Sequence, residues 1–444
     1  MKVLMFGWEY PPHISGGLGT ACFGLTKALT EKEVAIDFVV PCLYGDEPSN
    51  GAEIMAANKV VNTLSEKQIE HLEENISFFH IDSSILPYEN EEDYNRRMKE
   101  RDALAESKIN QTNSKILTSV SKDITRSFCV ELKGGYGKDL YEEVNRYAFV
   151  AGSIAKQREF DVIHAHDWLC FKAGEVAKKI SGKPLIVHVH ATEYDRSGEN
   201  VNERVYELER QGMEAADLIV CVSEYTRNTV ISKYFQPQHK VVCVHNGVIS
   251  QSTNTIRMQN VFDKKIVSFI GRITFQKGPD YFVEAAERVL KKDDGFVFVI
   301  AGSGDMEEKM IRLVARKKIS RNFFFTGFLE GEELKELLSI SSAFVMPSVS
   351  EPFGIAPLEA MQAGVPTIIS RQSGVSEVLN HAIKVDFWDV DSMADAIYSI
   401  GKHKALSDFL SRQGKLEAIS ITWDKAAEKL KELYNELVEK NRLI

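Results

Sequence analysis

The sequence predicts an α/β protein built from doubly wound parallel sheets, and three observations support this prediction. Short apolar runs such as Val3–Phe6 and Phe296–Ala301 are typical of strands that are buried on both faces. Helical patterns such as Thr20–Thr30 stand between these runs, as they do in α/β folds. Several runs end in glycine or polar residues, and open parallel sheets bind ligands at the carboxyl ends of their strands.

Length and composition narrow the class of protein. At about 150 residues per domain, 444 residues predict two or three domains. The net charge of −10 argues against nucleic acid or an anionic membrane as the main partner. No apolar run is long enough to span a membrane, and the chain starts directly with a strand, so we expect no integral membrane segment. The six cysteines form no Cys-x-x-Cys pair, which favours a reducing, cytoplasmic location.

The first half of the chain, residues 1–250, is expected to form one doubly wound domain. Its first strand leads through a glycine loop, Gly16-Gly17-x-Gly19, into a helix, an arrangement that can hold a phosphate. The spacing of these glycines differs from the Gly-x-Gly-x-x-Gly pattern of dinucleotide sites. Residues 62–137 are strongly charged and predict an insertion of helices and one strand. Within it, Gly134–Gly137 is either a turn or a lid.

Polar residues follow two later strands of this half, at Asp167 and at His190. These side chains would lie at the ligand-binding edge of a parallel sheet. His164 and His188 lie within the strands and are expected to be satisfied core histidines. Alternating histidines point to one face of a strand, but no further ligands stand nearby in the sequence. We therefore expect no metal site.

The second half repeats the α/β architecture. The polar stretch 249–263 is expected to link the halves, and residues 262–415 are expected to form the second doubly wound domain. This domain begins with the strand and loop Lys265–Arg272. The remaining residues, 416–444, contain an amphipathic segment from Thr422 to Glu439.

A loop and a helix follow the apolar run Ala343–Met346. Pro357 suits the first turn of this helix and Gly364 suits its end. Glu351 would then lie in the loop and Glu359 on the helix. The free N–H groups at the start of a helix offer donors to an anion, so this stretch predicts a phosphate or sugar site.

Four motifs together resemble one enzyme family. Glu351-Pro-Phe-Gly, with Glu359 eight positions later, resembles the signature of retaining glycosyltransferases of the GT-B fold. The loop from Arg272 to Lys277 is a second match. The stretches around Asp167 and His190 are similar to those of glycogen and starch synthases and their bacterial and archaeal relatives. The resemblance implies two Rossmann-like domains that face each other across a cleft, with residues 416–444 crossing back onto the first domain.

The resemblance also implies roles for individual residues. Two fixed cations would offset the charge on the departing diphosphate, and such electrostatic stabilisation is usually a large contribution to catalysis. The implied catalytic residues are His190, Arg272, Lys277 and Glu351. The implied donor-binding residues are Gly16, Gly17, Asp167, Gly302, Gly304, Thr326, Phe353, Gly354 and Glu359. No metal and no cofactor are implied, since the nucleotide sugar is a substrate.

The expected function is transfer of glucose from ADP- or UDP-glucose to an α-glucan, the reaction of a glycogen or starch synthase. The expected partners are a nucleotide sugar and an α-glucan or other saccharide acceptor. Many bacterial glycogen synthases place a lysine before the glycine pair, whereas this loop reads Pro-Pro-His-Ile-Ser-Gly-Gly. Three alternatives stay open. The first is a GT-B transferase of another sugar, such as GDP-mannose, in polysaccharide synthesis. The second is a sugar-nucleotide epimerase or hydrolase on the same fold, and the third is an inactive binding module.

Overall fold

The computed structural model describes residues 1–13, 17–48, 50–60, 64, 132, 140–249, 263–329 and 331–443. Gly16, the glycine-rich stretch Gly134–Gly137, almost all of the expected insertion at 62–137 and most of the linker at 249–263 lie outside the described residues.

A seven-stranded parallel sheet forms the centre of the first half, in the order β3-β2-β1-β4-β5-β6-β7. Its strands are β1 (Lys2–Phe6), β2 (Ala35–Val40), β3 (Glu53–Ala56), β4 (Val162–His166), β5 (Leu185–Val189), β6 (Leu218–Cys221) and β7 (Val241–Cys243). The α/β prediction is confirmed, because buried parallel strands are apolar on both faces and so are visible as apolar runs.

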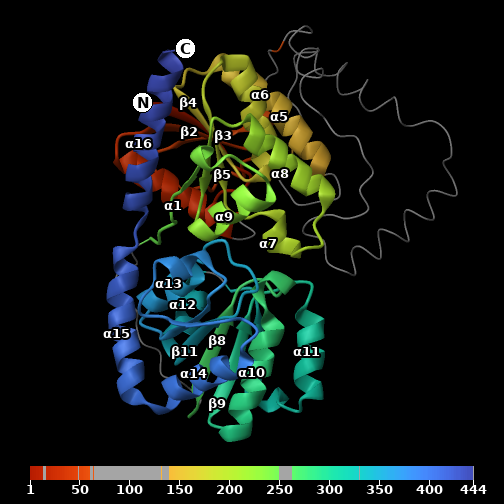
Figure 1. Ribbon diagram of the computed structural model, residues 1–444, viewed down its shortest axis with the longest axis vertical. Helices are drawn as coiled ribbons and strands as arrows, with labels where there is room; N and C mark the ends of the chain where they lie inside the picture. The colour runs from red at the N-terminus through yellow and green to blue at the C-terminus, as the bar shows by residue number, and fades with distance from the viewer. Residues whose placement is uncertain are drawn as a thin grey trace, which may run out of the picture.

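Helices cover both faces of this sheet (Figure 1). They are α1 (Gly17–Glu31), α5 (Leu140–Gln157), α6 (Trp168–Ser181), α7 (Glu193–Ser197), α8 (Glu203–Ala215) and α9 (Glu224–Lys233). Side chains alternate between the two faces of a strand. Leu4 and Phe6 of β1 accordingly pack with α5, α6 and α8, whereas Val3 and Met5 pack on the opposite face with α1.

The last helix, α16 (Trp423–Arg442), completes the core of the first half. It buries one stripe of side chains against the sheet face that α1 also covers, including Trp423, Ala427, Leu430 and Tyr434. This spacing of three and four residues is the apolar stripe of an amphipathic helix. In Figure 1, α15 and α16 run along one side of the molecule, and the two chain ends lie close together.

A six-stranded parallel sheet forms the second half, in the order β10-β9-β8-β11-β12-β13. Its strands are β8 (Lys265–Ile270), β9 (Phe296–Ala301), β10 (Phe323–Gly327), β11 (Ala343–Met346), β12 (Thr367–Ser370) and β13 (Ile383–Val385). The helices are α10 (Pro279–Lys292), α11 (Glu307–Arg316), α12 (Gly331–Ile340), α13 (Ala356–Gln362), α14 (Val390–Lys402) and α15 (Lys404–Ser420). Residues of α10, α11 and α14 belong to one hydrophobic core, and residues of α12 and α13 to two others.

The last strand of the first sheet, β7, ends at Cys243, where the chain leaves the sheet. Val248 instead pairs with Thr422 in an isolated parallel bridge, and its N–H donates to the Ile421 carbonyl at 3.0 Å. The two segments that connect the halves therefore run side by side.

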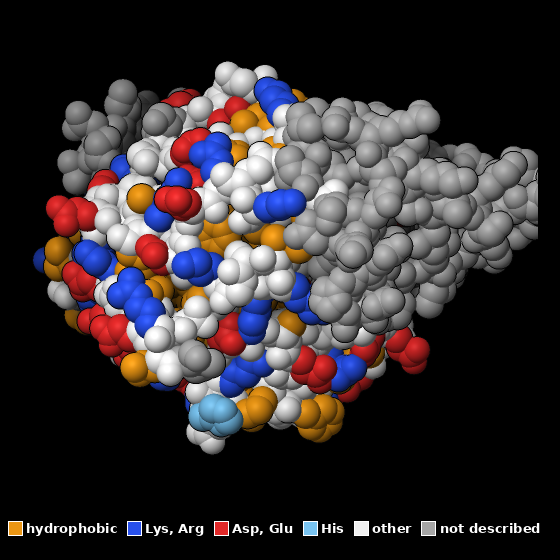
Figure 2. All heavy atoms as spheres, turned by 90° about the horizontal axis from the view of Figure 1, so that it is seen from above, with side chains coloured by type: hydrophobic (Ala, Val, Ile, Leu, Met, Phe, Trp, Pro, Cys, Tyr) orange, Lys and Arg blue, Asp and Glu red, His pale blue; other side chains and the backbone are white. Residues whose placement is uncertain are grey.

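The described surface carries intermixed charges on the face shown in Figure 2, where Lys and Arg side chains stand among Asp and Glu. Exposed ion pairs of this kind contribute about 0–1 kcal/mol each, so the fold depends on its buried cores. No helix among the described residues is long and apolar enough to cross a membrane.

Candidate active site

The two sheets place their ligand-binding edges against each other. Strand order reverses at β1 and β4 in the first sheet and at β8 and β11 in the second, and such switch points form ligand-binding crevices in open α/β sheets. Asp167 follows β4, and Arg272 lies in the loop after β8. Loop residues of the two halves touch, since Ser350 Oγ donates to Asp195 Oδ1 at 2.5 Å and lies 3.1 Å from the Tyr225 hydroxyl.

Asp167 holds the chain at His190. Its Oδ1 accepts hydrogen bonds from the backbone N–H groups of His190 at 2.7 Å and Ala191 at 3.3 Å. The backbone of Asp167 is strained, with φ 58° and ψ 169°, and strain of this kind is concentrated at functional sites. Burial raises the pKa of the Asp167 carboxyl to about 6, while the positive charge of Arg196 and the two N–H donors oppose this rise.

A buried ionic network supports the loop that carries His190. Arg196 Nε donates to Glu193 Oε2 at 2.9 Å, and its NH2 group pairs with Glu209 Oε1. The hydroxyl of Tyr234 donates to Glu209 Oε2, which also accepts from the Glu193 N–H at 3.0 Å. Burial raises the pKa of Glu209 to about 7, and Arg196 opposes this rise. The network fixes the segment between β5 and α8.

Lys277 and Glu351 form an ion pair at the switch point of the second sheet. Lys277 Nζ lies 2.5 Å from Glu351 Oε2, which also accepts from the Ser348 hydroxyl at 3.1 Å. Lys277 ends the short helix η3 (Phe275–Lys277) after β8, and Glu351 stands in the loop after β11. The structure thus brings together two residues from separate motifs of the sequence.

Arg272 and Glu359 stand on the same edge of the second sheet. The Arg272 side chain is exposed. Glu359 lies in the first turn of α13, where Pro357 occupies one of the first positions as the sequence predicts. Burial raises the pKa of the Glu359 carboxyl. No hydrogen bond reaches this carboxylate from the rest of the described chain, so both of its oxygens remain able to accept from a ligand.

Glycines let two loops of this edge, those after β8 and β9, approach each other closely. Gly302, with φ 142°, would place a Cβ only 1.9 Å from the Gly271 carbonyl oxygen. A Cβ on Gly304 would lie 2.4 Å from the Ile273 carbonyl oxygen. These positions therefore require glycine for packing of the backbone, whatever ligand they contact. Thr326 is exposed at the end of β10.

Three further predicted donor-binding residues lie in different surroundings. Gly17 is exposed at the start of α1, and no described residue lies within 4 Å of where its Cβ would stand. Gly354 has φ 105° and lies partly exposed next to Glu351. The Phe353 ring is only 2% exposed and belongs to a hydrophobic core, where it lies 6.2 Å from the His245 ring. The position of Phe353 is that of a core residue.

The expectation that no further ligands surround the strand histidines is wrong. One nitrogen from each of His164, His166 and His188 lies within 4.8 Å of the others, and Cys22, His166 and His190 form a second such group. Sequence spacing could not reveal this, because Cys22 comes from α1 and the histidines from two adjacent strands. His188 is buried, but its Nε2 has no hydrogen-bond partner among the described residues, so the expectation that it is fully satisfied is also wrong.

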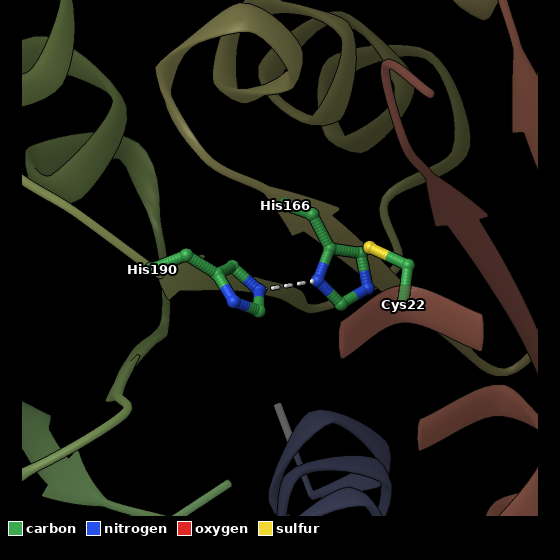
Figure 3. A group of neighbouring side chains, drawn as sticks. All are labelled: Cys22, His166 and His190. Atoms are coloured by element: carbon green, nitrogen blue, oxygen red, sulfur yellow. Dashed lines mark hydrogen bonds between the residues drawn. The ribbon is translucent and has the colours of Figure 1, made fainter. Parts of the chain in front are cut away.

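The geometry of these groups nevertheless does not suit a single metal ion. The rings of His164 and His166 are stacked, with centroids 4.3 Å apart and an interplanar angle of 20°. Nitrogen lone pairs lie in the plane of the ring, so stacked rings direct them side by side rather than toward one point. In Figure 3, Cys22 and His190 lie at opposite edges of the His166 ring. The absence of a metal stays a prediction.

Sequence reasoning missed the contacts that join the two halves. Glu377 accepts from the N–H groups of Glu224 at 2.9 Å and Tyr225 at 2.6 Å, and it lies 2.8 Å from His245 Nε2. Ser223 donates to the Pro352 carbonyl at 2.6 Å. No short motif marks these residues, because each depends on a partner in the other half of the chain.

Comparison with known proteins agrees with this architecture. Three family models match consecutive parts of the chain: starch synthase catalytic domain at residues 2–111, glycosyltransferase family 4 at 134–251 and glycosyl transferases group 1 at 252–417. An uncharacterised glycosyltransferase of Methanocaldococcus jannaschii is 26% identical over 459 residues, covering 99% of both chains. A glycogen synthase of Mycobacterium tuberculosis is 24% identical over 445 residues, covering 98% of this chain and 94% of that one.

Solved structures show the same fold at low identity. Sucrose-phosphate synthase from Thermosynechococcus elongatus has a TM-score of 0.68 at 16% identity and covers 99% of both chains. The catalytic domain of starch synthase IV from Arabidopsis thaliana, bound to ADP and acarbose, has a TM-score of 0.64 at 14% identity, with 99% of both chains covered. From the family models, the relatives and the fold together, this chain is a glycosyltransferase of the GT-B type.

Proposed function

We propose that this glycosyltransferase transfers glucose from ADP- or UDP-glucose to the end of an α-glucan, with retention of configuration, as a glycogen or starch synthase does. The observation that carries the proposal is the pairing of Lys277 with Glu351 at the switch point of the second sheet. Similarity to a glycogen synthase along almost the whole chain supports the choice of reaction. The fold shared with a starch synthase bound to ADP and acarbose agrees with a nucleotide and a saccharide as ligands.

The proposed roles follow from charge and position. Arg272 and Lys277 would offset the negative charge that forms on the departing diphosphate. Glu351 would accept hydrogen bonds from hydroxyls of the transferred sugar, once the donor displaces Lys277 toward the phosphates. Glu359, whose carboxylate is partly buried, would accept from the ribose hydroxyls. The chemistry that we propose uses these protein cations and no metal or cofactor.

On the side of the first sheet, His190 and Asp167 would contact the transferred sugar. The ring of His190 would form a hydrogen bond with a hydroxyl, since burial lowers its pKa to about 3 and keeps it neutral. Asp167 would use its Oδ2, because Oδ1 already accepts from His190 and Ala191. The cytoplasmic location stays a prediction from the sequence.

The test is incubation of the protein with ADP-glucose, UDP-glucose or GDP-mannose, each with and without glycogen. Nucleoside diphosphate release and glucan chain length measure transfer, and proton NMR of the new linkage reports the anomeric configuration. Elongation through an α linkage supports the proposal. Lys277→Met should abolish it, whereas Lys335→Met, on the exposed face of α12, is the matched control.

The other outcomes separate the alternatives. Acceptor-dependent consumption of GDP-mannose alone would favour a transferase of another sugar in polysaccharide synthesis. Formation of an epimer without acceptor would favour a sugar-nucleotide epimerase. A β linkage, or no turnover of any donor, would contradict the proposal.

A further inference from the structure

The histidines of β4 and β5 form two hydrogen-bonded pairs stacked on each other. His164 Nε2 lies 3.2 Å from His188 Nδ1, and His166 Nδ1 lies 3.0 Å from His190 Nε2. Adjacent parallel strands produce this arrangement, because residues two apart share a face and His166 is in register with His188. The His188 and His190 rings also stack, with centroids 4.3 Å apart. His190 therefore has a ring partner of its own, His166 (Figure 3).

His166 and Asp167 each form a hydrogen bond with a different part of His190. Asp167 fixes the backbone N–H of His190, at 2.7 Å, whereas His166 fixes the imidazole ring. Of the two paired rings, His166 is fully buried and His190 is partly exposed. Since His190 Nε2 faces His166, Nδ1 is the nitrogen that His190 has left for a ligand.

In the hydrogen bond between the His166 and His190 rings, one ring is the preferred donor. Burial lowers the pKa of His166 and of His190, so each ring is neutral and carries a single N–H. If His190 donated to His166, the His166 proton would sit on Nε2, which is buried without a partner among the described residues. Orphaned buried N–H groups are rarer in proteins than under-satisfied acceptors.

We propose that His166 is a positioning residue that donates its Nδ1–H to His190 Nε2 and so holds His190 as the Nδ1–H tautomer. His190 would then present an N–H donor, rather than an unprotonated acceptor nitrogen, to a hydroxyl of the transferred sugar. This part rests on the proposed function, because it assigns the free nitrogen of His190 to the sugar. The tautomer itself depends only on the arrangement of the rings.

The direct test is nitrogen-15 NMR of protein labelled at histidine, since the two ring nitrogens of a neutral imidazole have distinct shifts. The signals of His190 are identified by their loss in His190→Ala. We expect His190 to carry its proton on Nδ1 in the unmodified protein. A proton on Nε2 would overturn the inference without the use of any His166 variant.

Substitutions at His166 separate positioning from packing. His166→Leu removes the donor, and we expect a mixture of His190 tautomers and a fall of about tenfold in kcat. His166→Asn places an amide N–H close to the former Nδ1 and should restore both the tautomer and most of kcat. His164→Leu is the matched control, because His164 lies on the same face of β4, is equally buried and pairs with His188 instead.

The outcomes distinguish this inference from the proposed function. If His190→Ala inactivates the enzyme while His166→Leu changes neither the tautomer nor kcat, the inference is wrong and the proposed function stands. If His190→Ala leaves activity intact while the NMR shows an Nδ1 proton that depends on His166, the tautomer inference stands and the role of His190 in the reaction is wrong.

Discussion

The ion pair between Lys277 and Glu351 should contribute both to stability and to catalysis, and a double-mutant cycle separates the two. At 2.5 Å and an effective dielectric constant of about 20, the Coulomb attraction is about 7 kcal/mol before desolvation is subtracted. Breaking a buried pair typically costs about 3–5 kcal/mol. The side chains are 21% and 8% exposed, so we expect the lower end, about 3 kcal/mol of unfolding free energy.

The cycle uses Lys277→Met, Glu351→Gln and the double variant. Because both single variants break the same contact, the double variant should lose about 3 kcal/mol of unfolding free energy rather than the sum of the two single losses. Urea denaturation measures this coupling. Activity should behave differently, since the proposed function gives each residue its own part of the donor. Each single variant should lose about 100-fold or more in kcat, and the double variant should not recover.

The contrast between stability and activity makes the cycle decisive. A double variant that regains the kcat of the unmodified protein would show that the pair is purely structural and would refute the catalytic reasoning. Glu351→Gln with full activity would refute the role assigned to that carboxylate.

Three further predictions concern single positions. Glu359→Gln should raise the KM for the donor about tenfold with kcat nearly unchanged, because ribose binding changes little during transfer; a large loss of kcat in steady-state kinetics would contradict this. Gly24→Ala should destabilise the protein by about 1–3 kcal/mol in urea denaturation, since its Cβ would lie 2.2 Å from the Trp423 ring nitrogen. Gly414→Ala should be neutral or stabilising, because its Cβ would lie 3.0 Å from the end of the flexible Met361 side chain, and equal effects of the two variants would contradict the packing argument. The pKa of Glu209 in the folded protein, about 7, lies above its ordinary value, so the protein loses stability as the pH rises from about 4.5 through 7. Thermal unfolding should show this loss in the unmodified protein but not in Glu209→Gln, and a stability difference between the two that is independent of pH would contradict it.

Much of the fold could be predicted because its signals are local. The run Ala343–Met346 is β11 itself, since a strand covered on both faces must be apolar throughout. Pro357 occupies the first turn of α13, and Gly364 follows its end with φ 80°, as their backbone preferences require. The rule that parallel sheets bind ligands at the carboxyl ends of their strands also predicts the positions of Asp167 and His190.

The rest depends on contacts that no local pattern records. Lys277 and Glu351 are 74 positions apart, and Asp195 and Ser350 are 155 positions apart. These pairs form only because two domains meet with a particular orientation. The pairing of His166 with His190 likewise depends on the register of two strands, which the sequence alone does not specify.

The position of α16 has a consequence for how the protein is synthesised. The sheet face that includes Val3 and Met5 packs against Trp423 and Leu430, which the ribosome adds some 400 residues later. At about 5–20 residues per second, this interval lasts roughly 20–80 s, longer than most small domains need to fold. The whole second domain emerges in that time, while part of the first core stays exposed to water or to a chaperone. Nascent chains stalled before α16 should therefore bind chaperones through a domain whose strands have all been made.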